Sequence, residues 1–279
     1  MVITCMPGLG ELLRRELITL GVTAGEGSAA ALQVDMSVEQ ALTVCLRSRI
    51  AERVLVPVAS VEVGPQEAPV ALAAALASEH LKAAPALNVH ADHEAGVRGD
   101  SRVSGSVFAR SLDRPLPLSR ETRGALCLRL LIGEQRSRLF VDLCGEPLSR
   151  RGYRLQGGAA PLRETLAAAM LLAAQWQPDP ETGQWPALVD PFSGSGTVLI
   201  EAALLACRRA PGLMRDEFAF RYWSGFEPRR WDALRQQAEA EVIVPQGLLL
   251  KGFDADDAVQ RQARANAERA GVASLIHFE

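Results

Sequence analysis

The sequence has no uninterrupted apolar run near the roughly eighteen residues that a membrane-spanning helix needs. Its N-terminus also lacks a charged region followed by an apolar block, so no signal peptide is predicted. Cysteine is scarce: the five residues stand far apart and form no C-x-x-C pair. These absences argue against a disulfide framework or a zinc site and predict reduced, mostly buried thiols in a cytoplasmic protein.

A uniformly basic character is absent as well, because the formal net charge is −3. The charge is uneven, however: from Arg98 to Arg154 twelve arginines stand against six acidic residues. A basic middle on an acidic chain is compatible with a confined contact to phosphate. A solvated arginine-rich surface is the simpler alternative. The length of 279 residues and the hydrophobic fraction of 48 % allow two or three domains.

The first 145 residues predict two small α+β sandwiches of ferredoxin-like style. Their apolar periodicity predicts strands at 2–6, 30–36, 50–63, 86–91, 125–132 and 138–143, and helices at 10–20, 38–49, 67–81 and 101–112. Ser37 and Gln40 have the spacing of a helix capping box. Gly133 and Glu134 join the last two strands as in a hairpin. The predicted units are 1–56 and 57–145, followed by a glycine- and arginine-rich linker at 146–160.

The last part of the chain, 161–279, predicts a parallel sheet with crossover helices. Helices are expected at 162–176, 197–209, 228–242 and 256–270, and strands at 185–190, 247–253 and 275–278. Strands alternating with helices are typical of βαβ units. A doubly wound domain needs more than three strands, so the sequence is expected to be a fragment of a longer protein.

The most informative motif is the turn Asp190–Thr197, which reads Asp-Pro-Phe-Ser-Gly-Ser-Gly-Thr. A strand that ends in an acid, followed by a glycine turn and a helix N-terminus, is typical of a site for a small polar ligand. Gly194 and Gly196 permit a tight turn and close approach of a ligand. About sixty residues later, Asp254 follows the next predicted strand, where an acid accepts hydrogen bonds from ribose hydroxyls. Asp256 is the expected cap of the helix that follows.

Competing motifs fail on individual residues. A P-loop needs a lysine that Gly196-Thr197 lacks. A nucleophile elbow needs glycines two positions before and after Ser195, and a dinucleotide fingerprint needs a third glycine where Leu199 stands. His90 and His93 lie on opposite faces of a predicted strand and make a weak metal site, so no metal is expected.

The residues of this turn resemble motif I of class I S-adenosylmethionine-dependent methyltransferases, and Asp254 matches their motif II acid. The whole chain resembles the bacterial large-subunit rRNA guanine-N2 methyltransferases that carry a THUMP domain. The resemblance rests on five further segments: Gly8–Gly21, Val141–Arg154, Ala160–Met170, Ile200–Leu213 and Asn266–Glu279.

This resemblance implies a ferredoxin-like N-terminal unit, a THUMP RNA-binding domain and an incomplete Rossmann-like methyltransferase domain. It implies S-adenosyl-L-methionine as the cofactor, bound by Asp190, Phe192, Ser193, Gly194, Ser195, Gly196, Thr197 and Asp254. Phe192-Ser193 departs from the Met-Cys that is usual in the family. The family's Asn-Pro-Pro-Tyr motif, which grips the target amine, does not occur in these 279 residues. We therefore expect weak or no cofactor binding and no turnover by this chain alone.

The implied partner is large-subunit rRNA or its precursor particle. Six residues are candidates for RNA contact: Arg98, Arg102, Arg150, Arg151, Tyr153 and Arg154. The last four lie in the predicted linker, where a salt-bridged hinge is an equal alternative. Six of fourteen aromatic residues fall within 218–231, and there packing is favoured over base stacking. A tRNA guanine or DNA amino-methyltransferase, and a non-catalytic RNA-binding module, stay open as alternative functions.

Overall fold

The computed structural model describes residues 1–155 and 161–279, which divide into two compact units. The first unit contains Met1–Ile3, Arg53–Pro147 and Glu217–Pro228. The second contains Thr4–Glu52, Leu148–Asp216 and Arg229–Glu279. The segment up to Glu52 is thus grouped with the C-terminal part of the chain. In the described residues, no helix is both long and apolar enough to cross a membrane.

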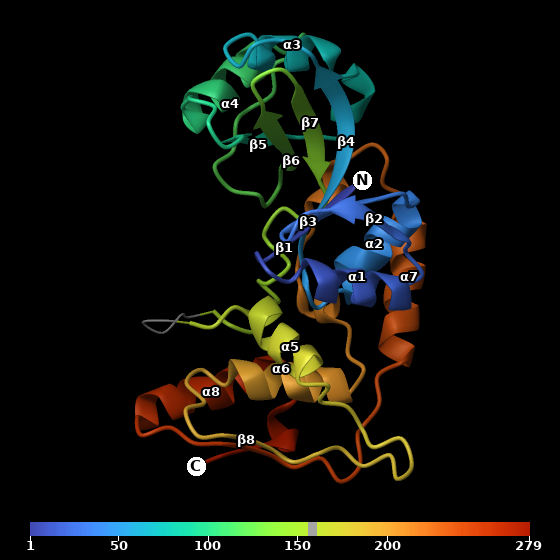
Figure 1. Ribbon diagram of the computed structural model, residues 1–279, viewed down its shortest axis with the longest axis vertical. Coiled ribbons are helices and arrows are strands. Elements are labelled where there is room, and N and C mark those ends of the chain that lie inside the picture. The colour runs from blue at the N-terminus through green and yellow to red at the C-terminus, as the bar shows by residue number, and fades with distance from the viewer. Residues whose placement is uncertain (156–160) are drawn as a thin grey trace. The chain divides into compact units, whose positions relative to one another are not determined.

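Four strands form the sheet of the first unit, in the order β4 (Ala51–Val61), β7 (Ser137–Asp142), β6 (Leu126–Ile132) and β5 (Leu87–His93). Strand β6 pairs antiparallel with β7, as predicted for a hairpin, and parallel with β5. Two helices, α3 (Ala68–Ala75) and α4 (Ser101–Arg110), pack together, and α4 also packs on β5 (Figure 1).

The helix predicted over 67–81 is two elements, because α3 ends at Ala75 and a 3-10 helix, η1, covers Ser78–Leu81. Leu76 and Leu81 are five positions apart and would lie about 140° apart on one α-helix. The extended backbone after Ala75 allows both leucine side chains to be buried.

The aromatic residues of segment 218–231 serve mainly in packing, which the sequence analysis favoured over base stacking. The 3-10 helix η3 (Ala219–Tyr222) contacts β6 and β7 of the first unit. The Phe220 ring lies 5.0 Å from those of Phe218 and Phe226. Trp223 donates a hydrogen bond from Nε1 to His80 Nδ1 at 3.1 Å. Most of these rings are buried and are therefore not available to stack on a base.

The second unit begins with a ferredoxin-like part that contains α1 (Gly10–Thr19), β2 (Ala24–Gly27), β3 (Ala31–Val34) and α2 (Val38–Arg47). Strand β1 (Val2–Cys5) precedes it and spans the boundary of the two units. The predicted capping box is confirmed: Ser37 Oγ accepts from Gln40 N at 3.2 Å, and Gln40 Oε1 accepts from Ser37 N at 2.9 Å. Strand β2 was not predicted, since its sequence Ala-Gly-Glu-Gly has little strand propensity; it pairs antiparallel with β3.

The C-terminal part of this unit is a parallel sheet in the order β10 (Ile276–Phe278), β9 (Leu250–Gly252) and β8 (Leu188–Asp190), as predicted. Its helices are α5 (Glu164–Ala173), α6 (Thr197–Ala206), α7 (Pro228–Ala240) and α8 (Asp257–Arg269), with 3-10 helices at Pro211–Met214 and Ala273–Leu275. Helix α6 contacts all three strands and lies beside α5 (Figure 1). Val189 of β8 is half-exposed.

The first part of the predicted linker at 146–160 is packed into the protein and is not an exposed connection. Leu148, Ser149, Arg151 and Tyr153 are all buried within the second unit. Leu148 N donates to Glu52 O at 2.9 Å. Residues 156–160 of that prediction lie outside the described part of the chain.

Replacing Gly252 by alanine is expected to lower the free energy of unfolding by about 1–3 kcal/mol, the usual cost of overpacking. The added Cβ would lie 2.6 Å from Leu199 Cδ1 and 3.0 Å from Ser193 Cβ. Urea unfolding measures the change. Gly64→Ala is the matched control, because nothing lies within 4 Å of a Cβ there. An equal loss in both variants would contradict the packing argument.

Candidate functional site

The turn between β8 and α6 has the form predicted from its glycines. Gly194 and Gly196 adopt left-handed backbone conformations, with φ of 54° and 79°. A Cβ at Gly194 would meet only Phe192 O at 4.0 Å, so the space above it is open. A Cβ at Gly196 would press on the Phe278 ring at 3.0 Å. The first glycine therefore permits access to the turn, and the second permits packing beneath it.

Two carboxylates meet at this turn, one from the end of each of two neighbouring parallel strands. Asp254 Oδ2 accepts a hydrogen bond from Gly194 N at 3.0 Å, and Asp190 Oδ1 accepts one from Phe192 N at 3.1 Å. Phe253 N donates to Asp190 O at 2.9 Å, which joins the two strand ends. A carboxylate has about four acceptor positions, so both acids retain capacity for ligand hydroxyl or amino groups.

Residues that were not singled out from the sequence brace the turn from α8. Asn266, fully buried, donates from Nδ2 to Ser195 O at 3.0 Å. Gln260 Nε2 donates to Asp254 O at 2.7 Å. Asp256 caps α8 by accepting from Ala258 N at 2.7 Å, as predicted. The sequence signal that could have identified Gln260 and Asn266 is their helical spacing, which places them on the same face as the buried Ala263 and Ala267.

The remaining residues of the turn differ in the exposure and the hydrogen-bond partners of their side chains. The Ser193 side chain is buried, and its Oγ has no hydrogen-bond partner among the described residues. Ser193 therefore serves the turn through its backbone, since its N–H donates to Phe253 O at 2.8 Å. Phe192 is 87 % exposed. Ser195 Oγ lies 3.2 Å from Thr197 Oγ1 at the start of α6.

Arg154, predicted to contact RNA, lies beside this turn. Its Nη1 donates to Leu162 O at 2.6 Å and lies 3.5 Å from Thr197 Oγ1. Its Nη2 donates to Glu164 Oε2 at 2.9 Å. Burial raises the pKa of the Glu164 carboxyl to about 6. The guanidinium therefore places a positive charge next to the N-terminus of α6.

The structure corrects the assignment of Arg151 and Tyr153 as RNA contacts, because both side chains are 1 % exposed. Arg151 donates to Leu148 O and Arg49 O, each at 2.7 Å, and its Nε lies 3.6 Å from Glu201 Oε1. Tyr153 Oη donates to the same oxygen at 3.2 Å. Burial raises the pKa of the Tyr153 hydroxyl, so it stays protonated. Of the four linker residues, Arg150 alone is exposed.

In the first unit, Arg98 and Arg102 are exposed as expected for RNA contacts. The N-terminus of α4 is capped by Asp100, whose carboxylate accepts from Arg102 N at 2.8 Å and Val103 N at 3.1 Å and so occupies the place that a phosphate would take. These bonds lower the pKa of Asp100. Arg102 instead lines a cavity of about 570 Å³ together with Arg120 and His90.

The weak metal candidate on β5 is accounted for by a local contact. His90 Nε2 lies 3.1 Å from Asp92 Oδ1, and this hydrogen bond lowers the pKa of Asp92. Within residues 1–155 and 161–279, no group of three or more histidine, cysteine or acidic side chains could hold a metal ion. All five cysteines are buried free thiols, as predicted for their burial.

Two family models match the chain. Residues 1–55 match the RlmL ferredoxin-like domain, and residues 151–279 match the RMKL-like methyltransferase domain. Among solved structures, SMU.472, assigned as a methyltransferase and complexed with SAH, superimposes with a TM-score of 0.84 at 24 % identity over 100 % of this chain and 74 % of that one. A predicted N6-adenine-specific DNA methylase from Listeria monocytogenes gives 0.83 at 27 % identity over 100 % and 73 %. The chain thus combines a ferredoxin-like unit with the Rossmann-like fold of S-adenosylmethionine-dependent methyltransferases.

Similarity in sequence points to a narrower group of proteins than similarity in fold does. The chain is 45 % identical over 280 residues to the ribosomal RNA large subunit methyltransferase K/L of Alcanivorax borkumensis, which covers 100 % of this chain and 39 % of that protein. Over the part of them that it spans, the chain is therefore similar to the RlmK/L-like rRNA large subunit methyltransferases. That part is about two fifths of the length of the curated relatives.

The raised pKa of Glu164 predicts a pH dependence of stability. The folded protein binds this proton more tightly than the unfolded chain, so the contribution is complete below about pH 4.5 and is lost as the pH rises through about 6. The expected loss in the free energy of unfolding is about 2 kcal/mol. Glu164→Gln should remove it.

Urea unfolding of both proteins at pH 4 and pH 7 measures the difference, because other groups titrate alike in both. Glu181→Gln, at an exposed position, is the control and should keep the wild-type dependence. A parallel pH profile for wild type and Glu164→Gln would refute the assignment.

Proposed function

We propose that this chain forms the cofactor-binding part of an enzyme that methylates the exocyclic N2 amine of a guanine in large-subunit rRNA, with S-adenosyl-L-methionine as donor. The observation that carries the proposal is the pair Asp190 and Asp254, joined through the backbone of the Gly194 turn. The names of the relatives that match the whole chain supply the rRNA substrate class. The cytoplasm, where such RNA is processed, is the proposed location.

The described residues fit this cofactor. Asp254 keeps acceptor positions for the two ribose hydroxyls, and the open space above Gly194 admits a ligand against the backbone. Arg154, beside Thr197, offers a charge partner for the carboxylate at the methionine end. When bound, the cofactor supplies an electrophilic methyl group. The residues here contribute binding and orientation, which is where much of the barrier reduction in such transfers comes from.

The first unit is proposed to be the THUMP domain and to contact the RNA backbone. Exposed Arg98, Arg102 and Arg120 support this role, since phosphate neutralisation supplies much of the affinity for nucleic acids. Arg150, which is exposed, is still proposed to contact RNA from the second unit. Arg151 and Tyr153 are assigned a structural role instead, because their burial leaves no surface for RNA.

A DNA amino-methyltransferase is the second candidate, favoured by the likeness to the Listeria protein. The two functions differ in what the first unit must bind. Competition between an rRNA hairpin and a DNA duplex of equal length, at one salt concentration, separates them. Preference for DNA would overturn the rRNA proposal while leaving the cofactor site intact.

Asp254→Asn should weaken binding of S-adenosylmethionine about tenfold or more, because a charge-assisted hydrogen bond to a ribose hydroxyl is replaced by a neutral one. Isothermal titration calorimetry on the full chain, at the high protein and cofactor concentrations that the expected weak binding requires, measures the affinity. Asp257→Asn, on the exposed first turn of α8, is the matched control and should bind like wild type. Equal affinity of Asp254→Asn and wild type would contradict the site.

Replacing Arg102 and Arg120 together by alanine should weaken binding of an rRNA hairpin and reduce the slope of log K against log salt by about 1–2. Fluorescence anisotropy at several salt concentrations measures both. Arg110→Ala, an exposed arginine on the same helix as Arg102, is the control. An unchanged slope in the double variant would exclude this surface as the RNA contact.

A further inference from the structure

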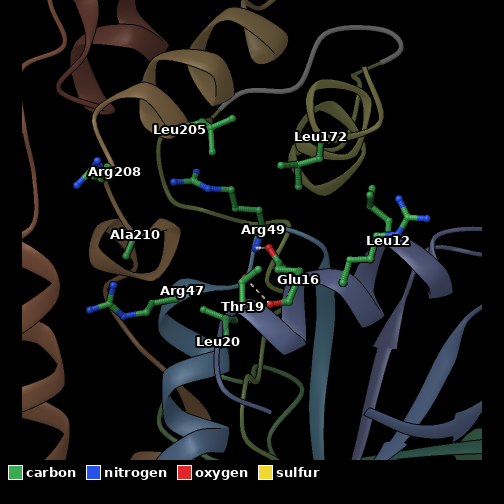
Figure 2. Close-up of a pocket in the computed structure, with 11 residues that line it drawn as sticks. Leu12, Glu16, Thr19, Leu20, Arg47, Arg49, Leu172, Leu205, Arg208 and Ala210 are labelled. Carbon is green, nitrogen blue, oxygen red and sulfur yellow. Dashed lines mark hydrogen bonds between the residues drawn. The ribbon is translucent and has the colours of Figure 1, made fainter. Parts of the chain in front are cut away.

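A second cavity, of about 390 Å³, lies in the second unit beside the C-terminal end of α6. The cofactor turn lies at the other end of this helix, so the two sites are about one helix length, roughly 15 Å, apart. Leu12 of α1, Leu172 of α5 and Leu205 of α6 line the cavity (Figure 2). The volume falls in the range of sites for small organic ligands.

A buried arginine forms one wall of this cavity. Arg49 is 9 % exposed, and in Figure 2 its side chain extends toward α6 and Leu205. Its Nη2 donates to Arg209 O at 2.9 Å and Leu204 O at 3.2 Å, which fixes the guanidinium. Its Nη1 is buried and has no hydrogen-bond partner among the described residues. A buried donor without an acceptor is costly, and a ligand oxygen would remove that cost.

A second arginine stands at the exposed side of the cavity. Arg208 follows α6 with a φ of 55°, a left-handed conformation that is uncommon for any residue but glycine. This conformation ends α6, because Arg208 N donates to Leu205 O and Arg209 N to Leu204 O, each at 3.0 Å, and it directs the side chain away from the helix end. Arg208 is exposed, and its charge interacts with that of Glu241, whose carboxylate is bound by Arg47.

The acids near the cavity already have partners. Glu241 binds Arg47, and Glu11 accepts from Arg15 Nε at 3.3 Å. Glu16 accepts from Ser48 Oγ, Arg49 N and Ile50 N, at 2.5, 2.6 and 3.3 Å. Glu201 also acts electrostatically on Arg49, but it contacts Arg151 and Tyr153 directly. The positive charge of Arg49 and Arg208 is therefore only partly offset.

We propose that this cavity binds a small organic anion with an aliphatic body. Its carboxylate or phosphate would accept hydrogen bonds from Arg49 Nη1 and the Arg208 guanidinium, which are charge-assisted donors. Its apolar part packs on the leucines of α1, α5 and α6. The described lining residues include no aromatic ring on which a nucleobase could stack, so the cavity suits such an anion better than RNA.

Hexyl phosphate is the probe, with inorganic phosphate and hexanol as ligands that carry only the charge or only the chain. Calorimetry and thermal unfolding of the full chain measure binding. We expect hexyl phosphate to raise the melting temperature by several degrees near saturation, and both partial ligands to bind at least about tenfold more weakly.

Arg208→Gly should weaken hexyl phosphate binding about fivefold to tenfold through loss of the charged donor, without loss of stability, because glycine accepts this φ. Thr19→Trp, at an exposed lining position, should block the cavity. Arg261→Ala, an exposed arginine on α8, should bind like wild type.

The proposal is overturned if hexyl phosphate binds no more tightly than inorganic phosphate or hexanol, or if Arg208→Gly and Thr19→Trp bind it as wild type does. It is also overturned if an RNA hairpin binds here and hexyl phosphate does not. Binding of S-adenosylmethionine, measured on the same variants, tests the proposed function separately.

Discussion

The second unit depends on one buried ion pair, Arg151 with Glu201. Arg151 comes from the segment that follows the first unit, and Glu201 from the middle of α6, with side chains 1 % and 0 % exposed. Removing one partner of such a pair leaves an uncompensated charge in the core, which commonly costs about 3–5 kcal/mol. Tyr153 shares the acid, and the carbonyl of Arg49 binds the arginine, so three separate stretches of chain meet at this point.

This arrangement fixes α6, and α6 carries the site at its N-terminus. The turn cannot shift along the helix axis without disturbing Glu201 one turn further on. Arg154 continues the same segment and reaches Thr197, so the ion pair and the cofactor turn are joined by only a few residues. A rigid helix between them is what preorganised binding requires, because the ligand then does not have to order the turn.

The parallel sheet, the helix caps and the pair of acids could be predicted from the sequence, because each of these features follows from a local pattern of residues. Ser37 and Gln40 lie three positions apart, Asp190 ends β8, and Asp254 follows β9 by two residues. Burial of charged residues was not predictable in this way. Arg151 and Arg150 are neighbours with the same chemistry, and only the distant Glu201 and the carbonyl of Arg49 decide which one is buried.

Contacts between distant segments also account for the other differences. Arg98 and Arg102 were singled out, but not Asp100 between them, whose side chain caps α4. Strand β2 owes its conformation to β3, not to its own residues. Arg49 and Arg208 were not singled out at all, since the cavity that they line is formed by four elements that are far apart in sequence.

The ring of Phe278 lies against Gly196 and Gly252, about eighty residues after the turn that it supports. Strand β10 also binds β9, and Glu279 N donates to Gly252 O at 2.9 Å. Detachment of β10 would therefore remove the packing partner of both glycines, and a ligand held by Asp254 would oppose that detachment by mass action. A motif of eight residues is thus, energetically, a property of the whole sheet.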